Sequence, residues 1–92
     1  MPAFRHVVLF HLHEGADPEP ALRVLRDACP ETGVLTWTVT RSLDQRKGIV
    51  VVEDATFVER EAFEDFRASD GHQAAVAHMS QCSDWVVGDW WD

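Results

Sequence analysis

The chain has 92 residues, 46% hydrophobic and 26% charged, and these proportions predict one small globular domain over residues 1–92. Sixteen acidic residues against eight basic ones give a net charge of −8, which argues against a nucleic acid or an anionic membrane surface as partner, since both bind basic surfaces. No apolar run is long enough to cross a membrane, and the first residues do not resemble a signal peptide.

The first predicted element is a strand over residues 4–12. Apolar side chains occupy both of its faces, a pattern typical of a strand that is covered on both sides. Asp17 and Pro18 then predict the start of a helix, because aspartate is a good N-cap and proline suits the first helical position. Apolar residues follow at helical spacing until Pro30, which ends the helix.

Two further strands form the middle of the chain. Residues 34–43 are rich in threonine, valine and tryptophan, which are residue types that favour strands. A polar turn over residues 44–48 separates this strand from a third one over residues 49–57, which contains a run of aliphatic residues.

The last part of the chain is predicted to be mostly helical. A second helix is expected over residues 59–69, and Asp70-Gly71 is expected to break it. A further helical piece follows, with His72 and Met79 on its apolar stripe. The chain ends in a predicted fourth strand over residues 85–91.

The order β-α-β-β-α-β predicts an α+β, ferredoxin-like fold in which four antiparallel strands carry helices on one face. The first and third strands are apolar on both faces, although the helices can cover only one face of the sheet. We therefore expect a homodimer in which a second copy covers the open sheet face. The side chains expected to be buried across this interface are Val7, Leu9, Val50 and Val52.

Four segments of the chain carry a resemblance to a known family: FRHVVLFHLHEG, GVLTWTVTRSL, ATFVEREAFEDFRASDGH and VVGDWW. Together they resemble the stress-responsive dimeric α/β barrel (Dabb) family through nearly the whole chain, in the same order and spacing. The most specific matches are the pair Arg5-His6 and the histidine after the second helix, His72. The resemblance implies two ferredoxin-like sheets packed face to face into a barrel, but it does not imply one function.

One plant member of this family folds a linear polyketide by an intramolecular aldol reaction. The resemblance places its essential histidine at His72 and a pocket histidine at His6. This chain departs from that enzyme: Phe66 replaces the tyrosine that pairs with the catalytic histidine, Val51 replaces a further pocket histidine, and Asp70-Gly71 stands where a proline is usual. The cyclase mechanism therefore does not carry across intact.

Glu53 should point inward, because it shares its strand face with Phe57, which must pack against the second helix. A buried carboxylate is costly unless it is paired, and the resemblance directs His6 and His72 toward the same space between sheet and helices. These three residues form a candidate catalytic group, with His72 as general base and His6 and Glu53 as helpers, for removing a proton α to a carbonyl. The alternative is a purely structural histidine–glutamate pair, or a Glu53 at the barrel mouth.

The same space is expected to hold a small, mostly apolar pocket. Its predicted lining residues are Val8, Phe10, Val51, Phe63 and Phe66. Four tryptophans are candidates either for the pocket or for the core and the interface, where aromatic residues dominate the energetics; they are Trp37, Trp85, Trp90 and Trp91.

His11 and His13 lie on the opposite strand face, at a spacing that can chelate a divalent ion. No third ligand accompanies them in the sequence, so we expect a solvated strand end, no metal site and no cofactor. Cys29 and Cys82 are too few for a disulfide framework and lack zinc-site spacing, and we expect reduced thiols in a cytoplasmic protein.

Three functions from different classes follow from these patterns. The first is a cofactor-free enzyme or binding protein for a small carbonyl or aromatic metabolite, acting by general-base chemistry as in a polyketide cyclase. The second is a non-catalytic stress-response or oligomeric structural protein. The third is a cofactor-independent monooxygenase, because such enzymes share the barrel.

Overall fold

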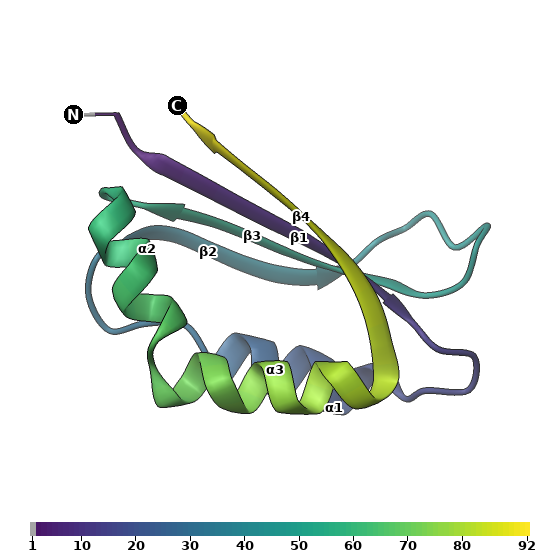
Figure 1. Ribbon diagram of the computed structural model, residues 1–92. Coiled ribbons are helices and arrows are strands. Elements are labelled where there is room, and N and C mark those ends of the chain that lie inside the picture. The colour runs from purple at the N-terminus through teal and green to yellow at the C-terminus, as the bar shows by residue number, and fades with distance from the viewer. Residues whose placement is uncertain (1) are drawn as a thin grey trace.

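The computed structural model describes residues 2–92 as a four-stranded antiparallel sheet with all its helices on one face (Figure 1). The strands lie in the order β2-β3-β1-β4. This arrangement confirms the predicted ferredoxin-like fold, with two consecutive helices in the second crossover. The elements are β1 (Phe4–Leu12), α1 (Pro18–Asp27), β2 (Val34–Arg41), β3 (Val50–Phe57), α2 (Arg60–Arg67), α3 (Asp70–Cys82) and β4 (Ser83–Trp91).

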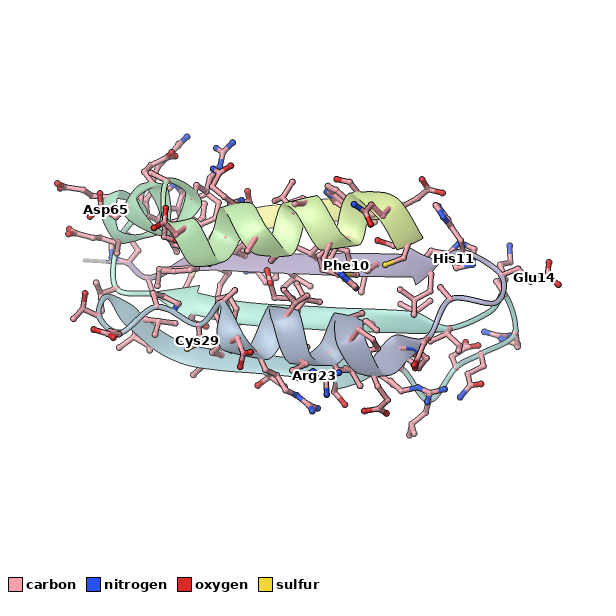
Figure 2. All side chains as sticks on the ribbon, turned by 90° about the horizontal axis from the view of Figure 1, so that it is seen from below. Phe10, His11, Glu14, Arg23, Cys29 and Asp65 are labelled. Atoms are coloured by element: carbon pink, nitrogen blue, oxygen red, sulfur yellow. The ribbon has the colours of Figure 1, made fainter. Side chains whose placement is uncertain are left out.

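Strand alternation decides which side chains meet the helices. The register pairs His6 with Ala55 and Val8 with Glu53, so the even residues of β1 and the odd residues of β3 share one face. That face is buried beneath α1 and α3, which run side by side across the sheet in Figure 2. The apolar core of the molecule lies between these two layers. Its fully buried larger side chains are Leu25, Val51, Phe57 and Met79.

Capping residues set where the helices begin. The Asp17 carboxylate accepts a hydrogen bond from the Glu19 backbone N–H at 3.0 Å and starts α1 as predicted. Ser69 does the same for α3, because its hydroxyl accepts from the His72 backbone N–H at 3.2 Å. Asp70 and Gly71 are therefore the first residues of α3, and the break between the two helices lies at residues 68–69, two residues earlier than predicted.

The predicted bounds of other elements were also wrong by one or two residues. Strand β2 ends at Arg41 rather than at residue 43, and Leu43 is 99% exposed in the loop. Strand β3 begins at Val50 rather than at residue 49. Strand β4 begins at Ser83, directly after α3, because the Ser83 hydroxyl donates to the Met79 carbonyl and ends the helix there. Helix α2 is shorter than predicted at both ends.

The second face of the sheet carries no helix (Figure 1). Leu9, Val86 and Trp90 are exposed on it, with exposed fractions of 43%, 63% and 46%. Val7, Val50 and Val52 are half-buried beside them. Arg5 pairs with Asp54 at 2.5 Å at the margin of these residues. Residues 2–92 include no helix that is both long and apolar enough to pass through a lipid bilayer.

Gly33 is a point where the fold requires glycine. Its φ is +81°, and a Cβ at this position would lie 2.8 Å from the Ala62 Cβ on α2. Gly15 has a similar φ of +84°, but nothing lies within 4 Å of the position of its missing Cβ. A substitution at either glycine would therefore strain the backbone, but only at Gly33 would the new side chain also clash with a neighbour.

We expect Gly33→Ala to destabilise the protein by about 2–4 kcal/mol, because left-handed backbone strain and a steric clash with α2 add together. Gly15→Ala should cost only about 1–2 kcal/mol, from backbone strain alone. Urea denaturation of both variants at one protein concentration measures the difference. Equal losses of stability would contradict the close packing of α2 on the start of β2.

Candidate functional site

A cavity of about 360 Å³ lies between the sheet and the helices, on the side of α3 and β4. This volume is within the range of small-molecule sites, roughly 300–1,000 Å³. Apolar side chains from β1, β4, α1 and α3 form most of the wall, and a few titratable side chains interrupt it. The lining residues that carry ionisable groups are His6, Glu53, Arg67, His72 and Asp89.

His6 is the buried centre of the polar part of the cavity. It lies on β1 between strands β3 and β4, so its ring reaches a carboxylate from each neighbour. The ring Nδ1 lies 2.6 Å from Asp89 Oδ1, and Nε2 lies 3.4 Å from Glu53 Oε2. His6 is 5% exposed and Glu53 is 4% exposed, whereas the Asp89 side chain is 35% exposed.

These contacts decide the charge of His6. Burial alone lowers the pKa of His6, but its contacts with Glu53 and Asp89 outweigh burial and raise the pKa above its ordinary value of 6.5. A doubly protonated ring can direct an N–H at both carboxylates, whereas a neutral ring would present a lone pair to one of them. The raised pKa and the carboxylate beside each nitrogen therefore favour an imidazolium held between Glu53 and Asp89, in which neither nitrogen is free to accept a proton.

His72 occupies the first turn of α3 and faces the same cavity. Its half-buried ring packs edge-on against Phe66, with ring centroids 4.7 Å apart. Burial lowers the pKa of His72, and the charges of His6 and Arg67 lower it further against the opposing effect of Glu53. His72 is therefore neutral near pH 7 and retains a nitrogen lone pair that can accept a proton.

The structure brings most of the predicted site residues together. His6, Glu53 and His72 line one cavity, and so do Val8, Phe10 and Phe63. Trp85 is the tryptophan in the cavity wall, and Trp37 packs on Phe66 in the core.

The prediction that Val51 and Phe66 line the cavity was wrong. Val51 is fully buried in the core. Phe66 packs against the rings of Trp37, Phe57 and Phe63, and it lies behind the cavity wall, where it contacts the lining residues His72 and Phe63.

Two ionisable cavity residues were missed by the sequence analysis, namely Asp89 and Arg67. Asp89 could have been found from strand parity, because it shares a face of β4 with Trp85 and Val87 and pairs with His6 across the ladder. Arg67 carries no comparable signal, since it reads as an ordinary basic residue in the last turn of a helix.

Within residues 2–92 no three histidine, cysteine or acidic side chains converge on a point where a metal ion could bind. Glu53 and Asp89 approach opposite nitrogens of His6, so their oxygens face the ring rather than a common ion. His11 and His13 are held separately at the end of β1: the His11 Nε2 contacts the Lys47 carbonyl, and the His13 Nε2 lies 3.5 Å from Asp84.

The stress responsive A/B barrel domain (Dabb) model matches residues 4–92, which is nearly the whole chain. A comparison with curated proteins finds no match.

Solved structures with this fold are similar over nearly their full length. A dimeric ferredoxin-like protein of unknown function from Thermobifida fusca is 19% identical, with a TM-score of 0.79 over 99% of this chain and 92% of the other. A Dabb family protein from Mesorhizobium loti is 18% identical, with a TM-score of 0.74 over 98% and 96%. A cofactor-independent oxygenase from Streptomyces nogalater is 20% identical, with a TM-score of 0.78 over 98% and 92%. At these identities the likeness extends to the fold alone.

The two carboxylates have separable effects on the two histidines, which gives a direct test of the site. Glu53→Gln should lower the pKa values of both His6 and His72, because the Glu53 charge raises both. Asp89→Asn should lower the pKa of His6 and leave His72 nearly unchanged. NMR titration of the histidine ring protons in wild type and both variants measures these shifts. A His6 pKa that neither substitution lowers would contradict the imidazolium assignment.

Proposed function

The chain belongs to the stress-responsive A/B barrel domain family, and we propose that it takes up a small carbonyl or aromatic metabolite in the cavity and removes a proton α to a carbonyl. The observation that carries this proposal is the neutral His72 imidazole on the wall of an otherwise mostly apolar cavity. A general base must touch its substrate and must be unprotonated at the working pH. His72 lines the cavity, where a ligand would contact it, its pKa is lowered, and the apolar wall around it favours apolar ligands.

The proposed step needs only groups that the chain itself provides. The His72 lone pair takes the α proton, and the electron pair of the broken C–H bond moves into the carbonyl to give an enolate. The Glu53 carboxylate stabilises the His72 imidazolium that results, since its charge favours protonation of that ring. His6 acts indirectly, because its imidazolium holds Glu53 in place from the neighbouring strand.

Two other functions remain as alternatives. One is a cofactor-independent oxygenase, which the likeness to the Streptomyces nogalater enzyme supports at the level of fold. Such an enzyme would consume oxygen. The other is a non-catalytic stress-response or oligomeric structural protein, in which His6, Glu53 and Asp89 only stabilise the fold.

We further propose that the protein is a homodimer through its open sheet face. The apolar residues Leu9, Val86 and Trp90 are exposed there in the isolated chain, which is unusual for a face of this size in a stable monomer. The similar protein from Thermobifida fusca is dimeric. A chain of 92 residues also buries a modest fraction of its surface alone and gains stability from a partner.

Deuterium exchange into phenylacetone in D₂O tests the proposed general base. Wild-type protein should accelerate exchange at the α carbon, and His72→Gln should lower this acceleration by about 100-fold or more. The wild-type rate should fall as the pH drops through the His72 pKa, which lies below 6.5, because protonation removes the lone pair. His78→Gln, on the same helix but outside the cavity wall, is the matched control and should leave the rate unchanged.

Absence of exchange above the buffer rate, or equal loss in both variants, would count against His72 as the base. Measurement of dissolved oxygen in the same reactions separates the oxygenase from simple proton transfer. Exchange without oxygen consumption would favour the proposed function over the oxygenase.

Leu9→Asp should abolish the dimer, because it would place an unpaired charge in the interface. Light scattering should give twice the chain mass of 10.4 kDa for wild type and the chain mass for the variant. Leu43→Asp makes the same substitution at a fully exposed loop position and should remain dimeric. A wild-type protein that is monomeric at micromolar concentration would refute the proposal.

A further inference from the structure

Arg67 is the permanently charged cation among the residues that line the cavity. It lies in the last turn of α2, five residues before His72, so the two side chains flank the junction between α2 and α3. Its guanidinium carbon lies 5.8 Å from the centroid of the Phe63 ring, which forms part of the cavity wall. Arg67 therefore stands at the rim of the cavity beside the proposed base.

The Arg67 charge is only weakly neutralised within the chain. Its one ion-pair contact among residues 2–92 is to Glu64, at 3.8 Å from Nη1 to Oε2. Glu64 also contacts Arg60 at 3.4 Å, and all three side chains are 46–64% exposed. Exposed pairs of this kind hold a side chain loosely. Arg67 can therefore exchange Glu64 for another anion at little cost.

The carboxylates inside the cavity form no ion pair with Arg67 among residues 2–92. Glu53 and Asp89 both contact the His6 ring instead, which as an imidazolium offsets one of their two negative charges. The Phe63 ring contacts both groups, with its centroid 4.7 Å from that of the His6 ring and 5.8 Å from the Arg67 guanidinium carbon. A ligand that fills the cavity up to its rim would remove water from the Arg67 guanidinium. This loss of hydration is unfavourable unless the ligand brings a negative charge.

We propose that the ligand of this cavity is a carboxylic acid, whose apolar body fills the cavity and whose carboxylate pairs with Arg67 at the rim. The proposal rests on the uptake of a small ligand proposed above and names its chemical class. A planar carboxylate matches the fork of one guanidinium through two parallel hydrogen bonds. One arginine matches the single charge of a carboxylate better than the nearly double charge of a phosphate monoester.

This pairing also places the reacting carbon. A carboxylate fixed at Arg67 anchors one end of the ligand at the α2–α3 junction, where His72 lies on the next helix. An acid with a carbonyl group a few bonds away would then present its α carbon to His72. Arg67 is in this view a positioning residue, because it acts on the substrate's carboxylate and not on the reacting atoms.

Binding of 4-oxo-4-phenylbutanoate and of its neutral amide, 4-oxo-4-phenylbutanamide, tests the proposal. The two probes share an aryl ketone and differ in charge. Wild-type protein at low salt should bind the acid about tenfold more tightly than the amide, by NMR titration. Arg67→Gln should abolish the preference by weakening the acid alone. Arg60→Gln, which removes the neighbouring contact of Glu64, is the matched control and should keep the preference.

The outcomes separate this proposal from the proposed function. Equal binding of acid and amide by wild type, or a preference that survives Arg67→Gln, overturns the carboxylate site, whatever the phenylacetone exchange shows. A preference that depends on Arg67 supports the site even if no exchange occurs, in which case the cavity binds an acid without turnover.

Discussion

The buried His6 imidazolium, held between Glu53 and Asp89, is the interaction on which the site depends. It joins three neighbouring strands, because β1 lies between β3 and β4 and its ring contacts one carboxylate from each. Loss of the His6 charge would leave the buried Glu53 carboxylate without a counter-charge among apolar side chains. This pairing explains why a small hydrophobic core tolerates such polar groups.

The same interaction separates the roles of the two histidines. Contacts with the carboxylates raise the pKa of His6, whereas burial, with the charges of His6 and Arg67, lowers the pKa of His72. The pKa values of two identical side chains in one cavity are therefore shifted in opposite directions. Environments that drive the pKa values of a pair apart are a common basis for dividing catalytic labour. Here the division leaves His72 as the one imidazole that can accept a proton.

Strand parity made much of this site predictable, and helix packing accounts for the rest. A period of two places Glu53 on the face of Phe57, and the structure puts both under the helices. The same reasoning applied to β4 would have added Asp89. Parity states the face of a residue but not its neighbours, so it could not tell that Val51 lies in the packed core instead of the cavity wall. The position of Arg67 depends on how α2 meets α3, which no local pattern encodes.

Alternation also couples the two faces of the sheet. Neighbouring residues on each strand point to opposite sides, so Arg5 and His6 enter two separate groups of charges. His6 meets Glu53 and Asp89 beneath the helices, while Arg5 meets Asp54 and lies 5.0 Å from the Trp90 ring on the open face. Both groups thus draw their side chains from β1, β3 and β4, and each residue of one group is the sequence neighbour of a residue in the other. A partner packed on the open face would therefore contact the same three strands that position His6 on the other face.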